Sequence, residues 1–373
     1  MSRSRSGGTL PDAILVMRGP GETRYALLAG EEVIEIAHRR DADVQPGAVY
    51  VGRVGAGVPG VSAVFVEFGD SLPGVLALKG RPPPQGSAVA VSVTVPARAD
   101  KGAELKASET KLPEGVKAPA LLKAAPDPAA VWWDCYKDGI TRIAASPARE
   151  AARLKAALGA DAPVEEGGGD FFAGVDETIE AALSPLVALP SGGSVIIEHT
   201  AAVTAIDVNS GSADPGTANT EAIAAVALEL RRRNIAGHIV VDLIPSRRRV
   251  PLARQMADAV SPDPVATNVA GVTPLGMVEI TRRRLGLSLA EVLCDGAELG
   301  AASVGYKLLR AAVAFALQAK TAGVVVSAAP EVAAALQGPL REALTEARDI
   351  LKGEIVLKVR ADFARSRFEF HPA

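Results

Sequence analysis

The sequence has few of the side chains that hold zinc or cross-link secreted domains, because its 373 residues include two cysteines and four histidines. Cys135 and Cys294 form neither a metal-ligand spacing nor a disulfide framework. No apolar run approaches the length of a membrane span, and the N-terminal sequence MSRSRSGG lacks the apolar core of a signal peptide. These absences predict a cytoplasmic protein that uses no zinc and does not contact a membrane.

The chain also lacks a large excess of charge, since 40 Lys and Arg stand against 43 Asp and Glu, a net charge of -3. Any contact with nucleic acid must therefore depend on local basic patches. A glycine-rich phosphate loop is missing too, because the glycines of residues 55–60 are interrupted by Pro59. A hydrophobic content of 48% nevertheless allows a large core, and the length predicts two or three domains.

The most informative stretch begins with a predicted strand at residues 203–209. Period-two alternation places Asp207 and Asn209 on one face, at the far end of an otherwise apolar strand. A Gly- and Pro-containing break follows, and it separates this strand from a predicted helix.

The helix is predicted from Thr220 to Arg233, with Asn219 as its cap and Glu221 in its first turn. The next strand, residues 239–244, is apolar on both faces apart from Asp242. That pattern is typical of a strand covered on both sides of a parallel sheet.

A strand, a helix and a second strand form a right-handed crossover, so the two strands should lie parallel and close together. Asp207 and Asp242 then meet at the carboxyl edge of the sheet, where open α/β folds place their chemistry. Two neighbouring carboxylates repel each other, and burial without a partner is costly. One Mg²⁺, which favours oxygen ligands, resolves both problems.

Four motifs in this region are similar, in sequence and in order, to the catalytic core of the ribonuclease E/G family. They are LPSGGSVIIE at 189–198, TAIDVNS at 204–210, the helix of 219–233 and GMVEITRRR at 276–284. The resemblance is strong over residues 187–292 and recognisable over residues 14–110. It implies a multidomain α+β and α/β fold, with an OB-type β-barrel and ribonuclease H-like and deoxyribonuclease I-like parts.

The composition and the resemblance together predict six segments. They are a disordered tail (1–12), an N-terminal hairpin with an OB-type RNA-binding barrel (13–110), a linker (111–130), a ribonuclease H-like subdomain (131–190), a catalytic α/β domain (191–296) and a small α/β closing domain (297–373). The closing domain should contain a helix, a strand, a helix and a strand, at 302–319, 324–327, 331–350 and 354–360. The ribonuclease H-like subdomain should be structural, because its predicted strands end in no acidic cluster.

The barrel segment contains several short strands separated by Gly and Pro, which is typical of a small closed barrel. By resemblance, Phe65 stacks on an RNA base, and Tyr50 and Arg53 belong to the same RNA-binding surface. The alternative is that Phe65 is a core residue, as most strand phenylalanines are. Val75 stands where the family has a second aromatic, so we expect weaker stacking.

Two arginine runs, at residues 247–249 and 282–284, follow closely on the strands of the core. Solvated surface charge and contact with RNA phosphates are about equally supported, because guanidinium groups match phosphate geometry. In the second interpretation Arg247, Arg282 and Arg284 bind RNA.

The chain departs from the family at two places. The zinc-binding Cys-Pro-x-Cys link is reduced to Cys294, so any homo-oligomer should form without zinc. The subdomain that senses a 5′-monophosphate is replaced by about 20 residues near 110–130. We therefore expect internal entry on RNA, with less than about a tenfold preference for 5′-phosphate ends.

These observations favour a Mg²⁺-dependent endoribonuclease that acts on single-stranded RNA, in ribosomal RNA processing or messenger decay. Asp207 and Asp242 hold the ion, and Asn209 orients the water or acts as a ligand. A general base role for His199 or His238 is a weaker alternative, since a metal-activated water needs none. Two other hypotheses remain open. One is an RNA-binding protein with lost or weakened cleavage, suggested by Pro245 and Pro274 at altered family positions, and the other is a structural partner in a degradation assembly.

Overall fold

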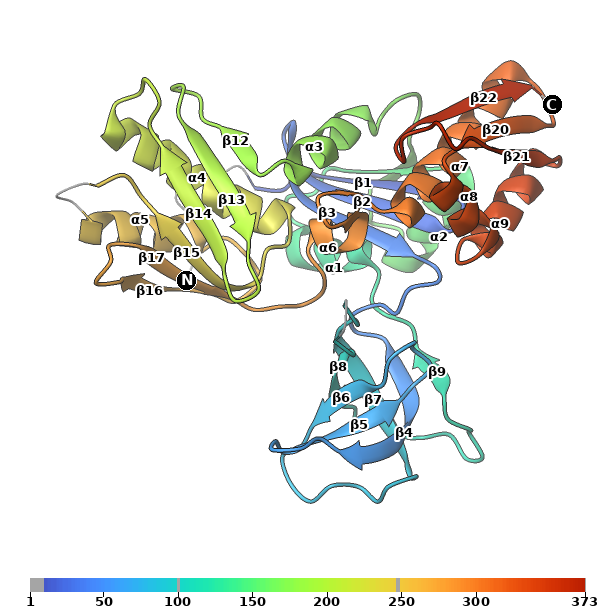
Figure 1. Cartoon of the computed structure of the whole chain (residues 1–373), viewed down its shortest axis with the longest axis horizontal. Coiled ribbons are helices and arrows are strands. Elements are labelled where there is room, and N and C mark those ends of the chain that lie inside the picture. Colours follow the sequence, from blue (N-terminus) through green and yellow to red (C-terminus); the bar gives the residue numbers. More distant parts are fainter. Residues whose placement is uncertain (1–9, 99–100, 246–248, 373) are drawn as a thin grey trace.

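The computed structural model describes residues 10–98, 101–245 and 249–372, so most of the predicted tail and the predicted RNA-binding Arg247 lie outside the described residues. Figure 1 shows a central sheet flanked by two α/β lobes, with a β-barrel projecting from the middle. The prediction of a mixed α/β protein with several sheets and a closed barrel is confirmed. Over the described chain, none of the helices has both the length and the apolar composition needed to cross a membrane.

The central sheet has five strands in the order β11-β10-β1-β2-β3. They are β1 (Ala13–Gly19), β2 (Glu22–Ala29), β3 (Glu32–Arg40), β10 (Arg142–Ser146) and β11 (Val164–Glu166). Residues 13–40, which the sequence pattern groups with the barrel, pair instead with β10, which runs parallel to β1. The barrel is therefore an insertion between β3 and α1. Apolar alternation identifies a strand but not a partner that lies more than 100 residues away.

Helices cover both faces of the central sheet. On one face α1 (Pro128–Tyr136) and α2 (Ala148–Leu158) pack against buried residues of β1 and β2. On the other face lie α3 (Ala173–Leu183) and α6 (Leu289–Leu293). α3 ends at Leu183, two residues before Pro185, as expected because the residue before a proline disfavours the helical conformation.

The barrel closes in the strand order β4-β5-β6-β8-β7, with β5 and β7 both paired to β4. Its strands are β4 (Val49–Gly57), β5 (Ala63–Glu67), β6 (Gly74–Ala77), β7 (Ala88–Val95) and β8 (Glu104–Ala107). Phe68, Leu76 and Val91 fill the interior. The predicted OB-like barrel is thereby confirmed.

The segment 111–130, predicted as a linker, contains a further strand. β9 (Ala120–Lys123) pairs antiparallel with the first half of β4, whose second half pairs with β5. The polar, Pro-rich composition conceals this strand because β9 lies at the edge of the barrel and buries little apolar surface.

The third sheet has the order β12-β13-β14-β15-β17-β16. Its strands are β12 (Leu186–Ala188), β13 (Ser194–His199), β14 (Thr204–Asn209), β15 (Gly237–Asp242), β16 (Thr267–Val272) and β17 (Val278–Arg282). β14 and β15 are parallel as predicted, but β13 and β17, on either side of them, are antiparallel to them. The prediction of a parallel sheet covered on both faces is therefore wrong.

Two helices, α4 (Pro215–Arg232) and α5 (Arg249–Val260), lie on the buried face of this sheet, where Ile206 packs with Val226 and Met256. The opposite face is open, and Figure 1 shows its strands without a covering helix. α4 begins five residues earlier than predicted. Its cap is Asp214, whose carboxylate accepts hydrogen bonds from Gly216 N and Thr217 N, each at 3.0 Å.

The C-terminal lobe follows the short β18 (Cys294–Asp295) and β19 (Glu298–Leu299) strands. It contains α7 (Ala301–Ala319), α8 (Pro330–Gln337) and α9 (Arg341–Leu351), packed on a sheet of order β21-β20-β22. The sheet consists of β20 (Val324–Ala328), β21 (Ile355–Val359) and β22 (Phe368–Pro372). The single helix predicted at 331–350 is wrong, because Gly338 and Pro339 separate α8 from α9. The pattern also missed β22.

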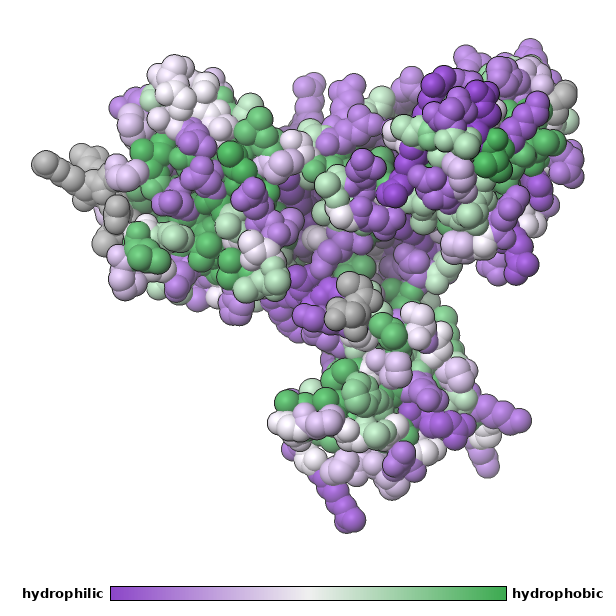
Figure 2. Space-filling view, in the orientation of Figure 1, coloured by the Kyte–Doolittle hydropathy of each residue, from purple (hydrophilic) through white to green (hydrophobic). Residues whose placement is uncertain are grey.

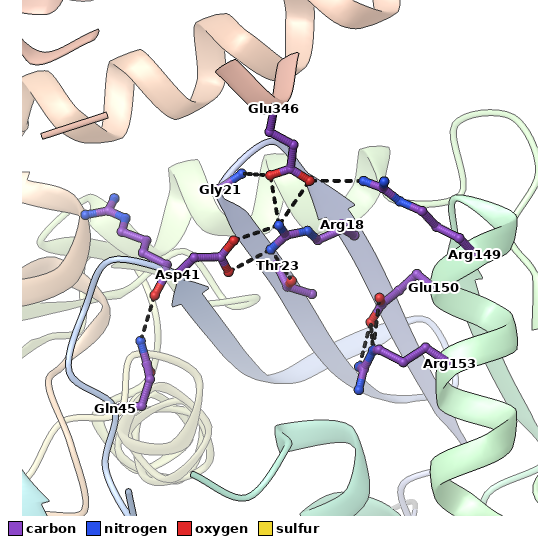
Figure 3. A network of polar contacts seen from close by, with 10 residues as sticks. Arg18, Gly21, Thr23, Asp41, Gln45, Arg149, Glu150, Arg153 and Glu346 are labelled. Carbon is purple, nitrogen blue, oxygen red and sulfur yellow. Dashed lines mark hydrogen bonds and ion pairs between the residues drawn. The ribbon is translucent and has the colours of Figure 1, made fainter. Parts of the chain in front are cut away.

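The C-terminal lobe is joined to the central sheet by a network of ion pairs (Figure 3). Glu346 of α9 accepts hydrogen bonds from Gly21 N at 2.8 Å and from Arg18 Nη2 at 2.9 Å. Arg149 of α2 donates to the same carboxylate at 3.0 Å. Arg18 also pairs with Asp41 at 2.7 Å. The Glu346 carboxylate thus connects the C-terminal lobe to the turn between β1 and β2, to β1 itself and to α2.

Candidate active site

Asp207 and Asp242 lie side by side at the carboxyl ends of β14 and β15. The two are direct register partners in the parallel pair, where adjacent strands are about 4.8 Å apart. Both are exposed on the open face, while Ile206 and Val241 point into the core. The predicted meeting of the two aspartates is therefore present in the structure. Because both are exposed, repulsion between like charges applies here, but the cost of burial does not.

Asn209 is part of the same arrangement. It follows Asp207 by two residues and shares its face, and its Nδ2 donates a hydrogen bond to Asp207 Oδ2 at 2.8 Å. This bond holds the Asp207 carboxylate in one orientation. Asn209 thus acts on the first aspartate directly, a contact that strand periodicity allows but does not specify.

The donor set fits a hard divalent cation that keeps part of its water shell. Two carboxylates and an amide on an exposed face leave positions for water and phosphate oxygens, as Mg²⁺ requires. Within residues 10–98, 101–245 and 249–372, no group of three or more His, Cys, Asp and Glu side chains could hold a metal ion. The candidate centre therefore has two carboxylates, from Asp207 and Asp242.

Asn219 supports the centre from behind, although the sequence pattern assigned it to the helix cap. Its side chain is 1% exposed in the second turn of α4. Nδ2 donates to Ile244 O, and Oδ1 accepts from Ile244 N, each at 3.0 Å. This pair of bonds fixes the chain two residues beyond Asp242. An Asn inside a helix is unfavourable unless its side chain is used elsewhere, and that is the signal that could have revealed it.

Glu221 holds a second loop at the same edge of the sheet. Its Oε2 accepts hydrogen bonds from Ser191 N at 3.0 Å and Ser191 Oγ at 2.8 Å. The turn that contains Ser191 packs against Gly211, where a Cβ would lie 2.4 Å from the Gly192 carbonyl oxygen. The helix start at Pro215 moves Glu221 out of the predicted first turn, and it supports a loop there instead of the helix dipole.

Comparisons with known proteins identify this part of the chain. Residues 106–285, which contain both aspartates and Asn209, match the model described as the Ribonuclease E/G family. Through this segment the chain is similar to the Ribonuclease E/G family.

Similar proteins include both named branches of the family. Ribonuclease G of Salmonella typhimurium (strain SL1344) is 33% identical over 216 residues, which cover 52% of this chain and 44% of that protein. Ribonuclease G of Haemophilus influenzae is 42% identical over 133 residues, covering 33% of this chain and 27% of that protein. Ribonuclease E of Nostoc sp. is 44% identical over 132 residues, which cover 32% of this chain and 19% of that protein. The chain spans less than half the length of these relatives.

The two histidines near the core lie away from the aspartates. His199 is the register partner of Thr204, at the start of β14, and its Nδ1 lies 3.0 Å from Thr204 Oγ1. Burial lowers the pKa of His199. His238 lies at the corresponding end of β15. Asp207 and Asp242 lie at the opposite ends of these two strands. The distance between the histidines and the aspartates supports a structural role for each histidine and not a role as general base.

The arginine run after β17 divides into three different environments. Arg282 is buried and pairs with Asp263 at 2.7 Å, and it also donates to Asn234 Oδ1 at 3.1 Å and Ile235 O at 3.0 Å. Burial argues against the predicted phosphate contact of Arg282. Arg284 is half-buried and pairs with Glu291 at 2.9 Å. Arg283, which the resemblance did not single out, is exposed.

The three predicted RNA-binding residues of the barrel also differ. Phe65 is 36% exposed and points outward between the buried Val64 and Val66, so the core interpretation does not hold. Arg53 is exposed as well. Tyr50 is half-buried with its ring edge-on to Phe68, 5.4 Å between centroids, and burial raises its pKa. Tyr50 thus belongs to the packing of the barrel.

On the β4 side, Gly55 lies close to Phe65. An added Cβ at Gly55 would lie 3.2 Å from Phe65 O and 3.5 Å from Phe65 Cβ, so glycine permits this close approach of β4 to Phe65. On the other side Phe65 is the register partner of Val75. The family position for a second aromatic is therefore adjacent to Phe65, on the same outer face.

We expect Phe65→Ala to weaken binding of single-stranded RNA by roughly 1–3 kcal/mol, the value of one stacked base, with little loss of stability. Phe68→Ala provides the contrast, since Phe68 is 1% exposed and its removal should cost about 3–5 kcal/mol in unfolding free energy. Fluorescence anisotropy and urea denaturation measure the two effects. Unchanged RNA affinity in a well-folded Phe65→Ala variant would remove Phe65 from the binding surface.

Proposed function

We propose that the chain is a Mg²⁺-dependent endoribonuclease that cleaves single-stranded RNA. The observation that carries this proposal is the exposed pair Asp207 and Asp242, in register on two parallel strands of a Ribonuclease E/G family segment. The relatives are named ribonucleases, but the chain matches less than half of each, so the activity of this chain is an inference.

The residues divide the chemistry between them. Asp207 and Asp242 bind the cation, and Asn209 orients Asp207 through the 2.8 Å hydrogen bond. The Asn209 amide oxygen can also accept a hydrogen bond from the attacking water. Mg²⁺, when bound, supplies activation of that water and neutralisation of charge on the phosphate. Attack of water on phosphorus breaks the P–O3′ bond, the 3′ oxygen takes a proton, and the products carry a 5′-phosphate and a 3′-hydroxyl.

The remaining features extend the proposal to the whole chain. We interpret the central domain as the ribonuclease H-like part and the β12–β17 lobe as the deoxyribonuclease I-like part of the catalytic core. We also propose a cytoplasmic protein that processes ribosomal RNA or degrades messengers. Any homo-oligomer should form without zinc, because Cys294 has no second cysteine beside it in the sequence.

An RNA-binding protein with weakened cleavage is the second candidate. It is favoured by Pro245, three residues after Asp242, and by Pro274 in the turn between β16 and β17. Both prolines replace polar family residues close to the carboxyl end of β15. In this case Phe65 and the barrel surface retain their function, while the two aspartates do not.

A fluorescent single-stranded RNA incubated with and without Mg²⁺ distinguishes the candidates. We expect cleavage with Mg²⁺ and intact RNA with EDTA. Matched substrates with 5′-phosphate and 5′-hydroxyl ends should differ in initial rate by less than about tenfold, or 1.4 kcal/mol. Binding without cleavage would favour the second candidate, and absence of both would leave a structural role in a larger assembly.

A further inference from the structure

A cleft of about 690 Å³ lies where the barrel meets the rest of the molecule. One wall is the barrel, another is β3 with α1, and the third is the segment that follows β17. Figure 2 shows hydrophilic residues gathered between the β12–β17 lobe and the barrel. The cleft thus lies between the barrel and the segment that follows the last residue of β17.

Two cations of this cleft are available to a ligand. Lys106 of β8 and Arg283 after β17 are both exposed, and neither has an ion-pair partner among the residues that the structure describes. The other lining cations are engaged: Arg39 with the carbonyls of Ala125 and Pro126, Arg231 with Glu35, Arg282 with Asp263, and Arg284 with Glu291. Asp43 and Asp70 also line the cleft, so its positive potential is local to Lys106 and Arg283.

The register of the barrel connects Phe65 to Lys106. Phe65 on β5 is the partner of Val75 on β6, and Val75 is the partner of Glu104 on β8. Lys106 follows Glu104 by two residues and therefore lies on the same outer face. Its partner on β7, Ser92, lines the cleft as well. The outer face of β5, β6 and β8 thus leads from Phe65 into the cleft.

The register of the third sheet connects Arg283 to the aspartates. Arg283 follows Thr281 by two residues, so the alternation of β17 places it on the same face of the sheet. Thr281 is the register partner of His238, and Thr281 and His238 are both exposed on the open face. His238, Val240 and Asp242 follow one another at alternate positions along β15. The open face therefore runs from Arg283 to Asp242 without crossing a covering helix.

We propose that single-stranded RNA follows this surface, and that Lys106 and Arg283 bind its phosphates where it crosses from the barrel to the catalytic sheet. This inference rests on the proposed function, because it assigns the path of the substrate of the same site. Both cations are matched to a polyanion: Arg283 offers a guanidinium fork and Lys106 a mobile ammonium group. Two such contacts also supply locally the positive charge that the chain lacks overall.

The test uses the full chain, a fluorescein-labelled single-stranded RNA and no divalent cation, so that binding is measured without cleavage. Lys106→Ala and Arg283→Ala should each weaken binding on the order of threefold to tenfold. The logarithm of the association constant decreases linearly with the logarithm of salt concentration, and the magnitude of this negative slope should be smaller by about 0.7 for each variant and by about 1.4 for the double variant. Thermal unfolding should be unchanged, because both side chains are exposed.

The matched control is the double variant Lys358→Ala/Arg341→Ala, which removes the same charge from exposed positions of the C-terminal lobe. It should keep the wild-type affinity and salt slope. The proposed path is wrong if the cleft variants bind with wild-type affinity and slope, or if the control loses as much. If the wild-type protein neither binds nor cleaves RNA, the proposed function fails together with the path.

Discussion

Asp207→Asn and Asp242→Asn are each expected to reduce cleavage of single-stranded RNA on the order of 10³-fold, about 4 kcal/mol in transition-state stabilisation. Each substitution removes one charged ligand and keeps the size of the side chain, so the sheet remains intact. RNA binding should persist, because Phe65 and the cleft lie on other elements. Initial cleavage rates, anisotropy and the Mg²⁺ concentration for half-maximal activity measure these effects.

Glu198→Gln is the control for this experiment. Glu198 is exposed on β13 and is the register partner of Ala205, so it lies on the same open face, one row away from Asp207. The same carboxylate-to-amide change at Glu198 should leave the cleavage rate within about threefold of wild type, below 1 kcal/mol. Near-normal cleavage by either aspartate variant would place the metal elsewhere.

Arg282→Met is expected to lower the free energy of unfolding by about 3–5 kcal/mol, the usual cost of removing one member of a buried ion pair. Both Arg282 and Asp263 have side chains 3% exposed, so Asp263 would be left charged without its partner. The carbonyl of Ile235 would lose a donor as well. Urea denaturation followed by circular dichroism measures the loss.

Two further variants make the interpretation specific. Arg283→Met changes the neighbouring exposed arginine and should alter stability by less than about 0.5 kcal/mol. The double variant Arg282→Met/Asp263→Leu replaces the pair with apolar groups and should recover part of the loss. If Arg282→Met instead unfolds like wild type and binds RNA poorly, Arg282 contacts phosphate and its ion pair with Asp263 does not contribute to the free energy of unfolding.

The placement of the candidate centre was predictable because it depends on local rules. Period-two alternation put Asp207 and Asn209 on one face of their strand, and the handedness of a strand-helix-strand connection brought Asp242 beside them. Neither rule needs knowledge of distant residues. The same rules could not show that β13 and β17 run antiparallel to β14 and β15, since pairing direction depends on residues outside the crossover.

Errors occurred where a residue's role depends on a partner far along the chain. Asn219 was assigned to a cap because the helix start was misplaced, and its partner Ile244 lies 25 residues away. Arg282 was assigned to RNA because three arginines in a row look alike in sequence. The positions of Asp263, Asn234 and Ile235 in the folded chain distinguish Arg282 from its neighbours.

By itself, the sequence determined the features that depend on short stretches of chain: the two aspartates at strand ends, most of the barrel strands, and the resemblance to one family. Local propensities and periodicities are sufficient for these features because each involves a few adjacent residues. Only the tertiary structure decided which strands pair, which face of the third sheet is open, and which arginines are free. These properties depend on contacts between distant segments, where burial and ion pairing assign different environments to identical side chains.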